Sequence, residues 1–340
     1  MIRSTLSRLA LLTATTLALV VPAALPAQAA PTLNRGDAAA GWLARQLVDG
    51  ERFEAVFDGV AYPDQGLTID AVFAFAATGT SGSYSAAAMG WLAQPATLAG
   101  YIGDGGEAYA GATGKLALAA QVTGADPAAF GGVDLISRLR GLQSPSGRFS
   151  DRSAWGDFSN TFTQSFAVLA LDRTAAGAPA ASVSYLAGVA CADGGFPVYF
   201  DQPTCVSDVD ATAVAVQALR AAGHPTPAAL SWLVAQQQAD GGFAGTGAVN
   251  ANSTGLAAQA LHSSGRLLAA ARARVFLRGL QQDCAAPVAE RGAIAYTAGG
   301  FDPATAVRAT AQSVLGLTGR GYAQLSSADS VPTAATLFCA

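Results

Sequence analysis

One helical unit recurs six times along the 340 residues of this chain. Its most regular part is an alanine-rich segment that begins at a polar or small residue and ends near a glycine. These segments begin at Thr68, Ala112, Asn160, Asp210, Asn252 and Thr305. A helix that is small and apolar almost all round belongs in an interior, packed on both faces. Polar residues at the start can cap such a helix, and glycine can end it.

A bulkier helix precedes each alanine-rich segment. Its markers are Trp42, Trp91, Leu135 with Ile136, Tyr185 with Leu186, Trp232 with Leu233, and Phe276 with Leu277. Because repeated units bury their apolar faces against one another, a closed ring leaves none of those faces open. We therefore predict an all-α fold, a single (α/α)6 toroid of six helical-hairpin repeats with an inner and an outer helix ring. The toroid is expected over residues 31–319, followed by a C-terminal tail over 320–340.

The composition excludes some classes of protein. Hydrophobic residues make up 51% and charged residues 12% of the chain, which excludes a disordered, charge-rich protein. The formal net charge is −4, so we expect no nucleic-acid partner bound through basic charge. Lys115 is the only lysine, against 18 arginines.

The first 30 residues have the pattern of a secretory signal peptide. Arg3 and Arg8 give a positive start, residues 9–25 are nearly all apolar or small, and Ala-Gln-Ala follows at 27–29. A membrane anchor is the alternative, but threonines and Pro22 interrupt the apolar run. We expect a secreted, extracellular protein whose mature chain does not insert into a membrane.

The cysteines fit an oxidising compartment. Four are present, Cys191, Cys205, Cys284 and Cys339, and an even number in a secreted chain suggests two disulfides. Three pairings are possible. We favour Cys191–Cys205, which closes a loop of about 15 residues worth roughly 3 kcal/mol. Cys284–Cys339 would then tie down the tail.

The turns between helices carry a second repeated motif. Gln-x-x-Asp-Gly-Gly-Phe stands at 237–243, its second half at 192–196, and a looser copy at 143–149. Glycine allows a positive φ, the aromatic ring fills the space between helices, and glutamine can bond a neighbouring helix end. These repeats resemble those of the terpenoid cyclase and protein prenyltransferase toroid superfamily, which carry the prenyltransferase and squalene oxidase repeat. The helical domain of cobalamin carriers is also similar.

The resemblance implies candidate catalytic residues. Class II terpene cyclases protonate their substrate with the middle acid of Asp-x-Asp-Asp, and this chain has Asp208-Val209-Asp210-Ala211. Asp210 would align with the proton donor and Asp208 with the first acid, whereas Ala211 replaces the third. The alternative is that Asp208 and Asp210 cap the fourth inner helix.

Two further chemistries can be compared with the residues. Protein prenyltransferases hold zinc through Asp, Cys and His, but His224 and His262 follow or end helices and no suitable trio is apparent. We therefore expect no metal and no cofactor. Other (α/α)6 barrels act on polysaccharides with acids and aromatic residues along one rim. This remains an alternative, because the sequence does not give the separation of the carboxylates.

Binding at a rim needs the fewest assumptions. All six inner helices should begin at one rim, where the longest insertions also fall, at about 147–159, 196–207 and 285–303. We hypothesise that this secreted protein, expected to be a monomer, binds a small-molecule, glycan or protein ligand there. The candidate ligand-binding residues are Trp155, Phe158, Asn160, Tyr199, Phe200 and Asn252.

Overall fold

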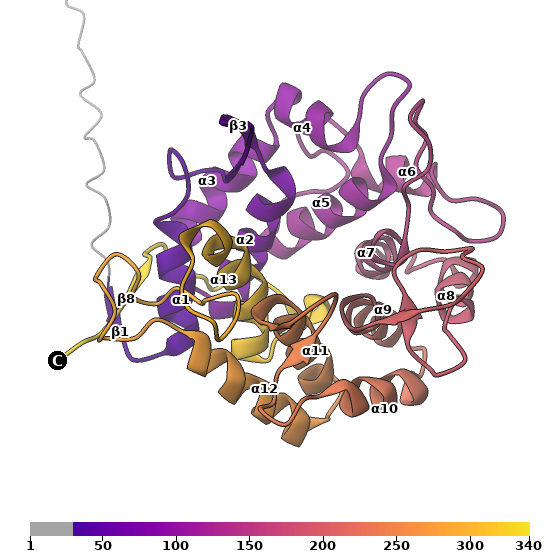
Figure 1. The fold of residues 1–340 in the computed structure, drawn as a ribbon. Helices are drawn as coiled ribbons and strands as arrows, with labels where there is room; N and C mark the ends of the chain where they lie inside the picture. Colours follow the sequence, from indigo (N-terminus) through magenta and orange to yellow (C-terminus); the bar gives the residue numbers. More distant parts are fainter. Residues whose placement is uncertain (1–29) are drawn as a thin grey trace, which may run out of the picture.

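The computed structural model describes residues 30–340, so the predicted signal peptide lies outside the described residues except for Ala30. The alanine-rich segments form a closed inner ring, in which each helix packs against the next and the last packs against the first (Figure 1). The inner helices are α2 (Gln65–Thr78), α5 (Ala110–Thr123), α7 (Thr161–Asp172), α9 (Val209–Ala221), α11 (Ala251–Ser263) and α13 (Pro303–Thr318). The predicted toroid is confirmed.

The bulkier helices surround this ring. They are α1 (Arg35–Ala44), α3 (Gly82–Leu92), α4 (Pro95–Ile102), α6 (Leu135–Arg140), α8 (Ala180–Gly188), α10 (Pro227–Gln236) and α12 (Leu267–Leu280). The second repeat has two outer helices where the sequence predicted one. Gln94 is extended because it precedes Pro95, and a residue before proline avoids the helical conformation. The chain therefore leaves α3 and starts α4.

Glycine lets the inner helices approach closely. A Cβ at Gly316 of α13 would lie 2.8 Å from the carbonyl oxygen of Gly255 on α11. A Cβ at Gly255 would in turn collide with the backbone of Gln312. These two positions require glycine because one helix backbone packs directly on the other.

The repeated turn motif joins the outer helices to the inner ones. Gly241 has a φ of +92°, and the Gln237 side chain donates to the carbonyl of Ala269 in the first turn of α12 at 2.8 Å. The Phe243 N–H donates to the hydroxyl of Thr254 in α11 at 2.9 Å. The same bond joins Phe53 to Thr68, Phe196 to Thr212 and Ile294 to Thr310. The glutamine and glycine roles predicted for this motif are confirmed.

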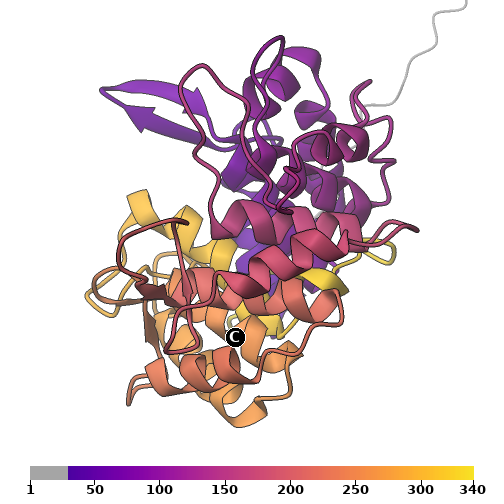
Figure 2. The same ribbon diagram turned by 90° about the vertical axis from the view of Figure 1, so that its right-hand side faces the viewer.

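Short antiparallel strand pairs precede three inner helices. They are β2 (Glu54–Phe57) with β3 (Val60–Pro63), β4 (Phe196–Pro197) with β5 (Ser207–Asp208), and β6 (Phe243–Ala244) with β7 (Val249–Asn250). The β2–β3 hairpin projects well beyond the helices (Figure 2). We call the end of the ring at which inner helices begin the N-terminal rim, and the opposite end the C-terminal face.

The tail closes the structure at the C-terminal face. It contains the short 3-10 helix η1 (Tyr322–Gln324) and strand β8 (Ala335–Leu337), which pairs in parallel with β1 (Ala30–Thr32). The disulfides are Cys191–Cys205 and Cys284–Cys339, so both favoured pairings are confirmed. Within residues 30–340, no helix is both long and apolar enough to cross a membrane.

Candidate functional site

A cavity of about 320 Å³ lies in the middle of the inner ring. All six inner helices contribute to its wall, together with α4 and η1. Its lining residues are Asp70, Tyr101, Gly111, Lys115, Asn160, Phe162, Thr163, Phe166, Val214, Leu256, Gln312 and Tyr322. A concave site of this kind, with aromatic walls and a few polar groups, is the usual form of a small-molecule site.

The cavity wall is built in layers. Five inner helices place their sixth residue in one layer, which consists of Asp70, Lys115, Phe166, Val214 and Leu256. Residues four apart lie one turn apart on the same face of a helix. The second residue of each helix therefore lies above this layer, nearer the N-terminal rim. This mouth layer consists of Gly66, Gly111, Phe162, Asp210 and Asn252.

One wall of the cavity is polar. The Lys115 Nζ lies 2.6 Å from Asp70 Oδ1, and the two side chains are only 15% and 8% exposed. The same ammonium group donates to the carbonyl of Gly66 at 3.0 Å, and Gln312 Nε2 donates to Asp70 Oδ2 at 3.2 Å. The only lysine of the chain is thus held on α5 by a buried carboxylate on the neighbouring α2.

The other walls and the base of the cavity are apolar. Phe162 and Phe166 come from α7, Val214 from α9 and Leu256 from α11. Tyr322 enters from the tail, and its ring packs edge-on against Phe166 with the ring centroids 5.3 Å apart. An elongated apolar group could contact these side chains while a polar group faced Lys115 and its partners.

Asp210 lies in the mouth layer, almost opposite Asp70. Burial raises the pKa of its carboxyl to about 6, with a smaller contribution from the charge of Asp208, whereas a hydrogen bond from Ser253 acts to lower it. Gly245 in the β6–β7 loop covers this carboxyl. Asp210 Oδ1 and Asn252 Oδ1 are both buried without a hydrogen-bond partner among the described residues.

Asp208 and Asp210, which were predicted as a pair, have different surroundings in the structure. Asp208 caps α9, because its Oδ1 accepts from the Ala211 N–H at 2.8 Å. Asp210, the second residue of α9, lies in the mouth layer and does not cap the helix, so the capping interpretation is correct for Asp208 alone. Similarly, Asn160 caps α7, whereas α11 is capped by Asn250 and Asn252 follows inside the helix.

The predicted rim aromatics do not line the cavity. Trp155, Phe158 and Tyr199 are 80%, 67% and 62% exposed. Phe200, in contrast, is buried against Tyr185 and under the Arg148 guanidinium. Phe200 therefore stabilises its loop and is not displayed at the rim. Of the predicted ligand-binding residues, Asn160 is the one that lines the cavity.

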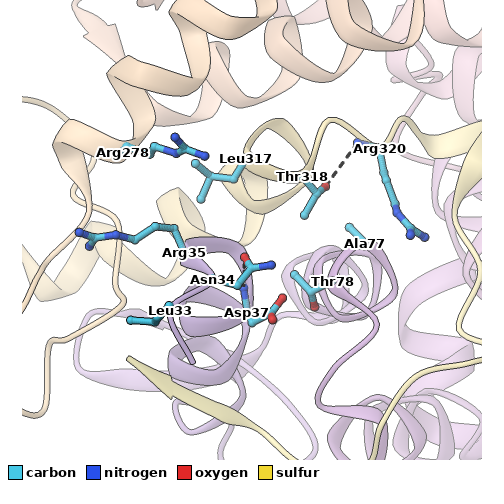
Figure 3. Close-up of a pocket in the computed structure, with 10 residues that line it drawn as sticks. All are labelled: Leu33, Asn34, Arg35, Asp37, Ala77, Thr78, Arg278, Leu317, Thr318 and Arg320. Carbon is cyan, nitrogen blue, oxygen red and sulfur yellow. Dashed lines mark hydrogen bonds between the residues drawn. The ribbon is translucent and has the colours of Figure 1, made fainter. Parts of the chain in front are cut away.

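A larger hollow of about 910 Å³ lies at the C-terminal face, next to the start of α1. It is lined by Leu33, Asn34, Arg35, Asp37, Ala77, Thr78, Arg278, Leu317, Thr318 and Arg320. The side chains of Arg35 and Arg320 point to opposite sides of this hollow (Figure 3). Because its charged groups do not converge on one point, this hollow is a weaker candidate than the central cavity.

Sequence reasoning missed most of the cavity residues. Asp70, Lys115 and Gln312 each interrupt a nearly apolar inner helix, and this was the available signal. Tyr101 and Tyr322 come from an outer helix and from the tail, and no repeated pattern marks them.

Comparison with known proteins shows the fold. No family model and no curated protein matches the chain. A protein from Actinoplanes superposes with a TM-score of 0.61 at 16% identity, over 84% of this chain and 98% of its own. A variant of the type II terpene cyclase MstE from Scytonema, in complex with geranylgeranyl dihydroxybenzoate, gives a TM-score of 0.63 at 16% identity, over 84% and 96%.

A second kind of enzyme shares this architecture. The unsaturated glucuronyl hydrolase from Bacillus sp. GL1, which is responsible for the degradation of glycosaminoglycan, matches with a TM-score of 0.52 at 13% identity, over 83% of this chain and 95% of its own. The resemblance predicted from the repeats is thus confirmed as a likeness of fold: this chain is an α/α toroid, similar to both terpene cyclases and a glycosaminoglycan-degrading hydrolase.

Proposed function

We propose that this protein binds a small amphipathic molecule in the central cavity. The observation that carries the proposal is the division of the cavity into a polar wall around Lys115 and apolar walls around Phe166 and Leu256. The expectation from sequence placed the ligand at the N-terminal rim. The cavity extends from the first turn of the inner helices into the second, inside the ring and below the rim loops, so the ligand would enter past Asp210 and Asn160.

The cavity volume limits the size of the ligand. At about 30 Å³ for each non-hydrogen atom, the volume of a water in the liquid, 320 Å³ holds about ten such atoms. This is about half the carbon count of the geranylgeranyl group in the MstE complex. We therefore expect a compact ligand or a short apolar chain with one polar end.

Two polar groups of the cavity are available to bond the polar end of the ligand. Tyr101 and Asn160 line the cavity, and neither the Tyr101 hydroxyl nor the Asn160 Nδ2 makes a hydrogen bond to the described residues. The Lys115 ammonium is already bonded to Asp70 and Gly66. A hydroxyl or amide could bond Tyr101 and Asn160 without breaking the ion pair, which favours a neutral polar end over a charged one.

Calorimetric titration with 1-octanol tests the proposal. The wild type should bind, and Leu256→Trp and Val214→Phe, which fill the cavity from two helices, should each weaken binding at least tenfold. Tyr199→Ala, at the exposed rim, is the matched control and should bind as the wild type does. Loss of binding in Tyr199→Ala with normal binding in both filled variants would contradict the proposal.

Asp210 supports a second candidate function, proton donation in a terpene-cyclase-like enzyme. Its pKa of about 6 keeps part of the carboxyl protonated near neutral pH, and it lies at the cavity mouth. An enzyme of this kind would convert a short polyprenyl substrate to a cyclic isomer, and Asp210→Asn would abolish the product. If Asp210→Asn leaves the yield unchanged, Asp210 is not the acid.

We also infer that the protein is secreted. Disulfides such as Cys191–Cys205 and Cys284–Cys339 persist in oxidising compartments, which supports export. The intact mass of the protein from the culture medium should correspond to a chain that has lost about the first 30 residues. A chain that retains this segment and stays in the cell would contradict export.

A further inference from the structure

We infer that Tyr322, carried by the C-terminal tail, is the floor of the central cavity and sets the length of the ligand that the cavity accepts. This inference rests on the proposed function. It assigns a specific role to a tail that no repeat of the toroid contains.

The Tyr322 ring fills the ring of inner helices from below. The side chain is only 6% exposed, and it packs edge-on against Phe73 of α2 and Phe166 of α7, with centroid separations of 5.4 and 5.3 Å. These two helices lie on different sides of the ring, so the tyrosine spans the space between them. Below the layer that contains Phe166, the cavity therefore ends at Tyr322.

The backbone around Tyr322 is fixed to the C-terminal face. The Tyr322 N–H donates to Gln217 Oε1 on α9 at 3.0 Å. Arg173, which follows α7, donates to the carbonyl oxygens of Tyr322, Ala323 and Leu325 at 3.4, 3.3 and 2.9 Å. The floor is thus held by the neighbouring inner helices α7 and α9.

The tail continues across the ends of two further inner helices, α5 and α2. The Ser327 N–H donates to the carbonyl of Val122 at the end of α5, and the Val331 N–H to that of Gly79 after α2, both at 2.9 Å. Carbonyls at helix ends lack intrahelical partners, and the tail supplies donors to them. The Cys284–Cys339 disulfide then anchors the end of the chain.

The floor is thin. On the other side of η1 lies a hollow of about 140 Å³, lined by Gln217, Arg220, Ala221, Ser263, Gly321, Ala323 and Gln324. Tyr322 lines the central cavity, whereas its neighbours Gly321 and Ala323 line this hollow. The segment that carries Tyr322 therefore separates the two spaces, and loss of the tyrosine ring should lengthen the central cavity towards this hollow.

A chain-length series of ligands tests the inference. Linear primary alcohols of six to twelve carbons are titrated by calorimetry into the wild type, Tyr322→Ala, Tyr322→Leu and Tyr322→Phe. In the wild type, affinity should rise with chain length and then level off or fall near eight or nine carbons, since the cavity holds about ten non-hydrogen atoms. Tyr322→Phe keeps the ring and should keep this limit.

The shortened side chains should increase the alcohol chain length at which affinity levels off. In Tyr322→Ala, dodecanol should bind at least tenfold more tightly than in the wild type, and Tyr322→Leu should give a smaller gain in the same direction. Tyr322→Leu retains more apolar packing, so it tests the inference if Tyr322→Ala does not fold. If folded Tyr322→Leu or Tyr322→Ala binds the series with the wild-type limit, Tyr322 is not the floor. If the wild type binds none of the alcohols, the proposed function itself fails, and this inference with it.

Discussion

Two buried carboxylates on opposite sides of the inner ring differ in the groups that surround them. Asp70 on α2 is paired with Lys115 and accepts a second hydrogen bond from Gln312. Asp210 on α9 has no cation beside it; one oxygen has no partner among the described residues, and its pKa rises to about 6. The same ring of helices therefore holds one buried carboxylate, Asp70, that is paired with a lysine, and a second, Asp210, whose pKa is raised towards neutral pH.

The largest effect is expected from removing the cation that holds Asp70. Lys115→Met should destabilise the protein by about 3–5 kcal/mol, because it leaves a buried carboxylate without compensation. Urea unfolding at pH 7.5 measures this. The double variant Lys115→Met with Asp70→Asn should recover most of the loss, and equal stability of the single variant and the wild type would show that the pair is not needed.

Removing the charge of Asp210 should instead stabilise the protein. Its folded-state pKa of about 6 exceeds the ordinary 3.8, so the native state binds the proton more tightly than the unfolded state does. The stability this provides is fully present below about pH 4 and is lost as the pH rises through 6. Asp210→Asn should therefore stabilise the protein by about 2–3 kcal/mol at pH 7.5, and the gain should shrink towards pH 4.

Urea unfolding of both proteins between pH 4 and 8 checks this dependence. Asp208→Asn is the control: asparagine caps a helix about as well as aspartate, so this variant should keep the cap of α9 and show no comparable gain at pH 7.5. A gain from Asp210→Asn that is constant with pH would contradict the proposed state of Asp210.

A smaller effect is expected at the hydrogen bond that opposes this pKa rise. Ser253 bonds the Asp210 carboxyl and acts to lower its pKa. Ser253→Ala should shift the midpoint of the carboxyl titration up by about 1 pH unit, which NMR of the side-chain carbon can follow. A downward shift would mean that the hydroxyl bonds the protonated form.

Much of the fold, but little of the cavity, could be predicted from the sequence. The alanine-rich period, the glycine ends and the Gln237 turn specify the ring because each is a local property that repeats. The cavity depends on which side of each inner helix faces the centre. Helices that are apolar almost all round, such as the one that carries Phe73, give no stripe from which to infer this rotation.

Two cavity residues could have been inferred from neighbouring residues that the sequence analysis did predict. Val214 and Leu256 lie four residues after Asp210 and Asn252, and this spacing places each pair on one helix face. Phe200 could not be recognised as buried, because its contact with Tyr185 joins a loop to an outer helix. Tyr322 depends on the path of the tail, which the repeats do not specify.

A crystal structure of the protein grown with 1-octanol would show directly whether the ligand lies inside the ring. We expect octanol between Phe166 and Leu256, with its hydroxyl bonded to Tyr101 or Asn160 and its chain ending at Tyr322. Octanol at Trp155 and Tyr199 on the rim, with only water in the central cavity, would contradict it.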